Sequence, residues 1–183
     1  MSYVEIYVAG KDGKLHSHSS ARNNHGYGPC MWDQVADEAG IHRDVVRGTA
    51  KKLPILYDDI AFRELWRRFA DGELSRPHML LMAGTEDTTY FVPGDVLEVA
   101  DALDACLKAI CETNPIVRTM EEMATILRKV VKDTPDLRAV AFNACSARES
   151  YWSIYDAEAD DTTPFDLGKP QKKAIPSSSW KHV

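Results

Sequence analysis

Apolar and polar residues alternate with a period of two at the start of the chain. In residues 3–8 the odd positions are aromatic or acidic and the even positions are aliphatic, which is the pattern of a β-strand with one buried face. Asp12-Gly13 follows, and this pair is typical of a two-residue hairpin turn that needs positive φ angles. The sequence therefore predicts an N-terminal β-hairpin in which Ala9 faces His16 and Leu15 joins the aliphatic face.

Four later stretches place apolar residues three and four positions apart, as an amphipathic helix does. They run from Pro29 to Ala39, from Phe62 to Phe69, from Val96 to Ile110 and from Met123 to Val130. Asp58 or Asp59 is the expected N-cap of the second helix. Asp95 and Thr119 each stand three residues before a glutamate, which is the spacing of a capping box at the start of the third and fourth helices.

Shorter apolar runs predict further strands. Pro54 limits the run Leu53–Tyr57 to a short edge strand. His78–Met82 is expected as a buried strand, with Thr88–Val92 as its continuation or its hairpin partner. The other expected strands are Leu137–Ala144 and Tyr151–Tyr155. Ile41–Lys52 fits either a short helix or a basic loop.

These elements predict one α+β domain over residues 1–156, with a mixed or mostly antiparallel sheet and helices packed on one side. Residues 157–183 turn acidic and then rich in Pro, Ser and Lys. Such a composition buries little apolar surface, so we expect an extended or disordered C-terminal tail.

Composition narrows the classes of partner. The formal charge of −6 among 183 residues predicts no general attraction to nucleic acid or to an anionic membrane. The first residues, MSYVEIYV, predict neither a signal peptide nor a membrane span. The four cysteines are dispersed and form no C-x-x-C pair, which favours a reduced, cytoplasmic protein. We expect no cofactor.

The segment from Leu15 to Asp33 holds most of the candidate chemistry. His16, His18, His25 and Cys30 carry ligand atoms that suit zinc. Their spacing, H-x-H-x6-H-x4-C, matches no standard zinc motif, and histidines on an exposed strand face need no metal. The pattern therefore favours surface histidines, with zinc as the weaker alternative.

The same segment fits an anion site. Arg22, Asn23 and Asn24 precede a helix start, where a guanidinium and free backbone N–H groups can bind a phosphate or a carboxylate. Cys30 would lie in the first helical turn, where the helix dipole lowers a thiol pKa. This is the alternative hypothesis: a small enzyme or ligand-binding protein for a phosphate-bearing or nucleotide substrate, with His18 or His25 as the acid or base and Cys30 as a possible nucleophile.

Aromatic residues point to a different class of function. Tyr27 and Trp180 are of the types that anchor protein interfaces. Trp180 stands in a polar tail with nothing nearby in the sequence to pack against, which indicates a partner surface on the same chain or on another.

The segment RNNHGYGPCMWDQVADEAG, with Asn24, Gly26, Trp32 and Asp33 straight after an N-terminal strand, resembles a pattern in small uncharacterised bacteriophage proteins. The resemblance covers the first quarter of the chain. It implies a viral or mobile-element origin and a setting in the bacterial cytoplasm, and it favours a protein that binds and modulates a host component. The leading hypothesis is therefore a non-enzymatic, phage-encoded protein-binding modulator of a host bacterial system, with a host protein or a second copy of the chain as its partner.

Overall fold

The computed structural model describes residues 3–22, 27–110, 114, 116–143, 152–156, 161–169 and 174–180. A mixed seven-stranded sheet with the order β5-β6-β2-β1-β4-β3-β7 forms its centre. The strands are β1 (Tyr3–Ala9), β2 (Lys14–Arg22), β3 (Thr89–Phe91), β4 (Ala139–Asn143), β5 (Ser153–Asp156), β6 (Asp161–Asp166) and β7 (Ile175–Pro176). Neighbouring strands are antiparallel except for β3 and β7. The predicted α+β class and the N-terminal hairpin are confirmed.

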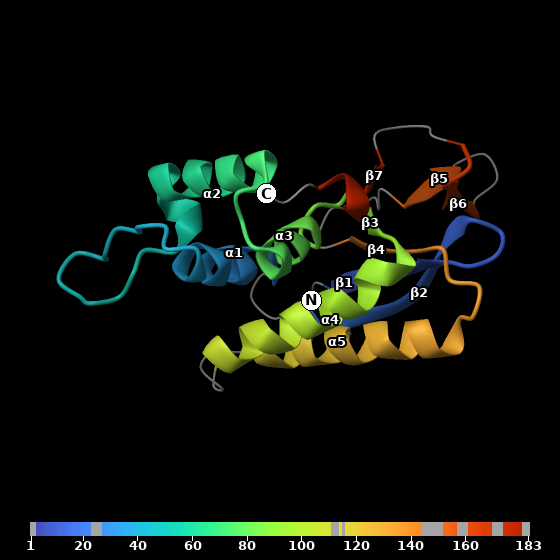
Figure 1. Cartoon of the computed structure of the whole chain (residues 1–183), viewed down its shortest axis with the longest axis horizontal. Coiled ribbons are helices and arrows are strands. Elements are labelled where there is room, and N and C mark those ends of the chain that lie inside the picture. Colours follow the sequence, from blue (N-terminus) through green and yellow to red (C-terminus); the bar gives the residue numbers. More distant parts are fainter. Residues whose placement is uncertain are drawn as a thin grey trace.

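Five helices accompany the sheet in the described chain. They are α1 (Tyr27–Glu38), α2 (Asp59–Asp71), α3 (Arg76–Ala83), α4 (Pro93–Ala109) and α5 (Ile116–Asp133). Two short 3₁₀ turns, η1 (Ile55–Tyr57) and η2 (Ser177–Ser179), complete the elements. Figure 1 shows α4 and α5 side by side along the sheet, while α1, α2 and α3 gather at the end away from the β1–β2 turn. No helix of the described residues is both long enough and apolar enough to cross a membrane.

The hairpin has a different register from the predicted one. Gly13 has φ +69° and its N–H donates to the Gly10 carbonyl at 3.0 Å, and the four residues from Gly10 to Gly13 separate the two strands, in place of the predicted two-residue loop. Ala9 therefore pairs with Leu15, not with His16. Because paired residues share a face of the sheet, Leu15 lies with Tyr7 and Ala9, away from the aliphatic face.

A β-bulge in β2 reverses this change. Ser17 pairs with Tyr7 and Ser19 pairs with Ile6, which leaves His18 as the extra residue. One extra residue moves every later side chain to the opposite face. Ala21 consequently returns to the main core, although it lies an even number of positions after Leu15.

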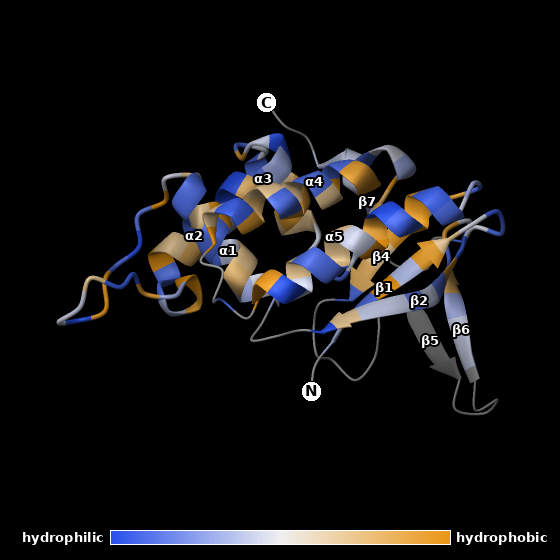
Figure 2. Ribbon diagram, turned by 90° about the horizontal axis from the view of Figure 1, so that it is seen from below, coloured by the Kyte–Doolittle hydropathy of each residue, from blue (hydrophilic) through white to orange (hydrophobic). Residues whose placement is uncertain are grey.

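The two faces of the sheet are buried in different ways. The β1 face with Val4, Ile6 and Val8 belongs to the main core, which the helices cover. The opposite face, with Tyr7 and Leu15, is covered by Trp152 and Phe165, because β6 pairs with β2 and the β5–β6 pair closes over it. The sheet thus has helices on one side and its own curled end on the other (Figure 2).

Two expected strands are not strands. His78–Met82 lies in α3, where residues Met79–Ala83 are all buried, and a helix buried all round has no polar face that would reveal its period. Leu53–Tyr57 contains η1, which starts after Pro54 and whose first residue, Ile55, donates its backbone N–H to the Asp33 carboxylate at 2.7 Å.

The helix ends differ in part from the prediction. Asp58 caps α2 by accepting the N–H of Ala61 at 3.0 Å, as expected, and Gly72 ends that helix with φ 73°. The two capping boxes are wrong. Asp95 lies inside the first turn of α4, where its carboxylate binds Arg76 and Ser177. Thr119 lies inside α5 and donates its hydroxyl to the Arg22 carbonyl.

The described part of residues 157–183 lies on the domain. β6 and β7 extend the sheet, and the buried Ser177 hydroxyl donates to Asp95 Oδ2 at 2.6 Å. Trp180 packs on Phe69 with ring centroids 4.4 Å apart and donates its indole N–H to Thr89 at 3.3 Å. The contact surface of Trp180 is therefore on the same chain.

The α4 helix provides a test of the core. Leu103 is completely buried, whereas Leu97 on the same helix is exposed. Leu103→Ala should lower the free energy of unfolding by about 2–5 kcal/mol because it removes packed methyl groups. Leu97→Ala is the matched control and should change it by less than about 0.5 kcal/mol. Urea titrations that gave equal losses for the two variants would show that the core lies elsewhere.

Candidate functional site

The candidate residues of the Leu15–Asp33 segment are spread along the molecule. Asn23, Asn24 and His25 lie outside the described residues. His16 is near the β1–β2 turn, with Nε2 2.8 Å from Asp12 Oδ2, whereas Cys30 lies on α1. Figure 1 shows that turn and α1 at opposite ends of the molecule. The structure therefore does not bring His16 and Cys30 together.

His18 lies in the β2 bulge, exposed, with its ring Nδ1 3.0 Å from the Ser19 hydroxyl. Within the described ranges, no three histidine, cysteine or acidic side chains group together in a way that could hold a metal ion. The zinc alternative includes His25, which those ranges omit.

The surroundings of Arg22 are acidic. Its backbone N–H donates to Glu122 at 3.4 Å, and its carbonyl accepts the Thr119 hydroxyl. A shallow hollow of about 400 Å³ next to it is lined by Ser20, Glu121, Glu122, Thr125 and Ile126. Arg118 pairs with Glu122 at 3.2 Å, and no basic side chain belongs to the lining itself. This hollow therefore does not supply the positive lining that an anion site needs.

Cys30 lacks the environment of an activated thiol. Burial, and secondly the nearby Asp33 carboxylate, raise the pKa of the Cys30 thiol above its ordinary value. A nucleophilic cysteine needs the opposite shift, because the thiolate is the reactive form. Tyr27 at the start of α1 is buried in the main core, and burial raises the pKa of its hydroxyl.

A different part of the chain has the most exposed apolar side chains. Of seven large hydrophobic residues exposed in the described structure, five lie between residues 45 and 60. They are Val45, Val46, Leu56, Tyr57 and Ile60, and we call them the 45–60 surface. Tyr57 is 74% exposed and Ile60 is 79% exposed. Clustered exposure of this kind marks a contact surface more often than scattered single residues do.

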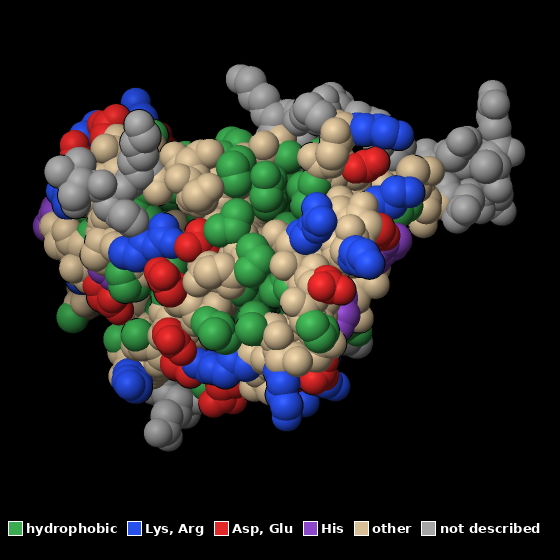
Figure 3. All heavy atoms as spheres, turned by 45° about the vertical axis from the view of Figure 1, so that its right-hand side comes forward, with side chains coloured by type: hydrophobic (Ala, Val, Ile, Leu, Met, Phe, Trp, Pro, Cys, Tyr) green, Lys and Arg blue, Asp and Glu red, His purple; other side chains and the backbone are tan. Residues whose placement is uncertain are grey.

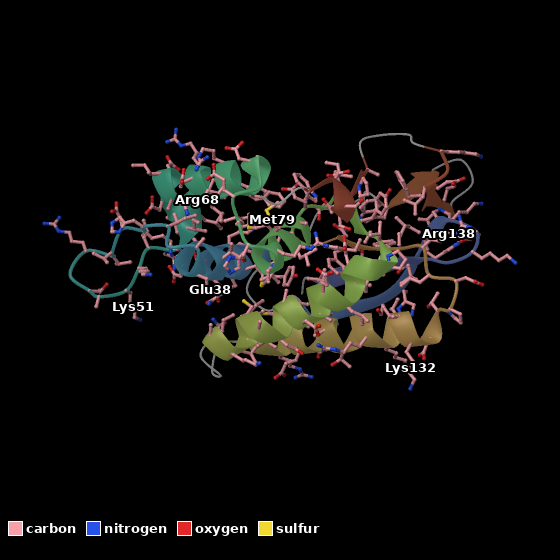
Figure 4. The ribbon with its side chains drawn as sticks, viewed as in Figure 1. Glu38, Lys51, Arg68, Met79, Lys132 and Arg138 are labelled. Carbon is pink, nitrogen blue, oxygen red and sulfur yellow. The ribbon has the colours of Figure 1, made fainter. Side chains whose placement is uncertain are left out.

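The first two residues of this surface lie on a hairpin, residues 44–53, which we call the finger. Val46 N–H donates to Lys51 O at 2.8 Å and Leu53 N–H donates to Asp44 O at 2.6 Å, and Gly48 turns the tip with φ 78°. Figure 1 shows this loop projecting beyond α1 and α2, and Figure 4 places Lys51 on it.

A buried arginine holds the base of the finger. Arg43 is 6% exposed. Its guanidinium donates to Asp33 at 2.5 Å, to both carboxylate oxygens of Asp37 at 2.8 and 3.2 Å, and to the Leu53 carbonyl at 3.0 Å. Lys52 adds a further bond to Asp37 at 2.8 Å. We call Arg43 with Asp33 and Asp37 the clamp.

The pKa shifts of the clamp carboxyls follow from these contacts. Partial burial raises the pKa of Asp37, but hydrogen bonds from Arg43 and Lys52 outweigh it and leave that pKa below its ordinary value. Burial raises the pKa of Asp33, and the Ile55 N–H and the Arg43 charge oppose this shift without cancelling it.

Asp58 joins the finger to α2. Its Oδ2 accepts the Asp44 N–H at 2.8 Å while its Oδ1 caps α2. These backbone hydrogen bonds, that of Asp44 first, lower the pKa of the Asp58 carboxyl. This bond brings the base of the finger next to the start of α2, and Val45 and Tyr57 are the chain neighbours of the two bonded residues. The sequence pattern was compatible with either a helix or a loop for Ile41–Lys52 and did not reveal the 45–60 surface. The exposure of Val45 and Val46 depends on tertiary packing.

No family model, curated protein or solved structure matches the chain. The geometry of the described residues is therefore the basis for assigning a function.

The pKa shift of Cys30 gives a test of the catalytic alternative. At pH 7.5, iodoacetamide should alkylate Cys30 several-fold more slowly in the folded protein than in the urea-unfolded chain, because burial lowers its thiolate fraction. Peptide mapping by mass spectrometry follows this cysteine separately from the others, and Cys30→Ser is the control for peptide assignment. Faster alkylation in the folded state would contradict the account and support an activated nucleophile.

Proposed function

We propose that the protein acts by binding another protein through the 45–60 surface, without catalysing a reaction. The observation that carries this proposal is that five of the seven exposed large hydrophobic side chains of the described structure lie within residues 45–60. They are on the finger, on η1 and at the start of α2, and Asp58 joins the finger to that helix. Tyr57 and Ile60 have the size to fill a pocket in a partner, and tyrosine is enriched among the residues that dominate binding energy.

The clamp supports this function. A loop that must become ordered on binding loses part of its interaction energy to conformational entropy. The finger is already closed by the backbone bonds of Val46 and Leu53 and is tied to α1 through Arg43. Val45 and Val46 are therefore presented to a partner with little further ordering, and Tyr57 and Ile60 lie on η1 and α2, which are already ordered.

The locations of the catalytic candidates support binding over chemistry. His18 is exposed in the bulge of β2, the pKa of Cys30 is raised, and the hollow beside Arg22 is acidic. His18, Cys30 and Arg22 thus lie in three different environments, and none of these has the properties that the catalytic alternative needs.

The partner proposed for this surface is a host protein. The resemblance of the Arg22–Gly40 segment to bacteriophage proteins is what supports a bacterial host and a modulating role. In this proposal the protein is phage-encoded and reaches its target in the bacterial cytoplasm.

Site-specific photo-crosslinking tests the proposal. A photoreactive phenylalanine analogue replaces Tyr57 in one variant and Leu97, which is also exposed but lies on α4, in the control. In bacterial cells, the Tyr57 position should crosslink one host protein and the Leu97 position should not. With that host protein purified, Tyr57→Ser combined with Ile60→Ser should weaken binding by about tenfold or more.

Two results would contradict this function. One is an identical crosslinking pattern, or none, from the two positions. The other is unchanged affinity of the purified host protein for the double variant, which remains folded by circular dichroism because both side chains are exposed.

A further inference from the structure

The charged residues around the 45–60 surface form two groups. Asp33, Asp37 and Asp58 are turned inward, where they bind Arg43, Lys52 and backbone N–H groups. Arg47, Lys51 and Arg63 are exposed, and no ion pair found among the described residues includes them. The carboxylates of Asp33, Asp37 and Asp58 thus have hydrogen-bond partners within the protein, whereas Arg47, Lys51 and Arg63 face solvent.

These cations flank the apolar side chains. Arg47 and Lys51 lie at the tip of the finger, just beyond Val46. Arg63 lies three residues after Ile60 on α2, so the two side chains share a face of that helix. The exposed carboxylates of the same segment are Asp44, at the base of the finger, and Asp59, which directly precedes Ile60 at the start of α2.

A shallow hollow adjoins Ile60. It has a volume of about 510 Å³ and is lined by Ile60, Arg63, Glu64 and Arg67. The carboxylate of Glu64 is bound by Arg67 at 2.9 Å and by Arg68 at 2.7 Å, so its charge is neutralised. Arg67 is also bound by Asp71 at 2.9 Å and by Glu73 at 2.7 Å. Arg63 is therefore the lining cation that pairs with no carboxylate of the described residues, and the stems of the two arginines give the hollow apolar walls.

The face shown in Figure 3 has acidic and basic side chains interspersed, with hydrophobic side chains between them. The chain as a whole has a formal charge of −6. A cationic rim around an apolar centre on an acidic protein selects a partner by charge, because like-charged surfaces are repelled and complementary ones are favoured.

From this arrangement we infer that the 45–60 surface binds an acidic segment of its partner that carries a bulky apolar side chain. The apolar side chain enters the hollow beside Ile60. The partner's carboxylates lie against Arg63 on one side and against Arg47 and Lys51 on the other. This inference rests on the proposed function and adds the chemistry of the partner to it.

A synthetic peptide provides the probe. It has about 12 residues, repeats Glu-Asp-Leu-Phe, and carries fluorescein for anisotropy measurements. Arg47→Glu combined with Lys51→Glu should weaken its binding by about tenfold or more, because two attractive charges become repulsive. Lys108→Glu combined with Lys129→Glu is the matched control: both lysines are exposed on α4 and α5, and the net charge changes equally. The control should bind within about twofold of wild type.

Two further probes separate the acidic and apolar contributions. A peptide with Ser in place of Leu and Phe should bind the wild-type protein at least tenfold more weakly. The Leu/Phe peptide should likewise bind the Ile60→Ser protein at least tenfold more weakly than it binds wild type. Oligothymidylate, which has negative charge without apolar side chains between the charges, should also bind weakly.

Three results would overturn the inference: no binding of the Leu/Phe peptide at concentrations up to about a millimolar, equal binding of oligothymidylate, or equal losses in the two charge-reversal pairs. A host protein that crosslinks at position 57 but binds the Arg47/Lys51 variant unchanged would overturn this inference alone. Loss of the position-specific crosslink would instead overturn the proposed function.

Discussion

The contact of Arg43 with Asp33 and Asp37 is the interaction on which the projecting end of the molecule depends. A guanidinium that is 6% exposed needs compensation for the water that it has lost. It receives two carboxylates from α1 and the carbonyl of Leu53 from the finger. Replacing one of these partners would leave a buried charge without compensation. The direction of the finger is therefore fixed by electrostatics, because the valines of the finger are exposed and supply no core.

The rest of the chain covers its own apolar faces. The helices cover one face of the sheet, and Trp152 and Phe165 cover the other. Trp180 returns from the C-terminal segment to cover Phe69 on α2. A chain that covers these faces still leaves Tyr57 and Ile60 exposed. This contrast indicates that their exposure is connected with function, since nothing in the packing of the described core requires it.

The sequence was a good guide where local chemistry decides the structure. The hairpin and the Asp58 cap follow from residues within a few positions of one another. It was a poor guide where distant residues compete. Asp95 has the spacing of a cap, but Arg76 and Ser177 recruit its carboxylate from far along the chain. The extra residue His18 is invisible in the period-two pattern, and the exposure of the finger depends on the buried Arg43 rather than on its own sequence.

Hydrogen exchange in the finger tests most directly whether the clamp holds it. The amides of Val46 and Leu53 close the hairpin and can be followed by NMR in wild type and in Arg43→Met. The account predicts that both amides exchange about tenfold or more faster in the variant, while amides of α5 keep their protection. In wild type, opening the finger requires breaking the ion pairs of Arg43 with Asp33 and Asp37, and the variant lacks these pairs. Arg128→Met, which removes exposed pairs with Asp101 and Asp104, is the control and should leave the finger unchanged. Unchanged protection of Val46 and Leu53 in a folded Arg43→Met protein would contradict the account.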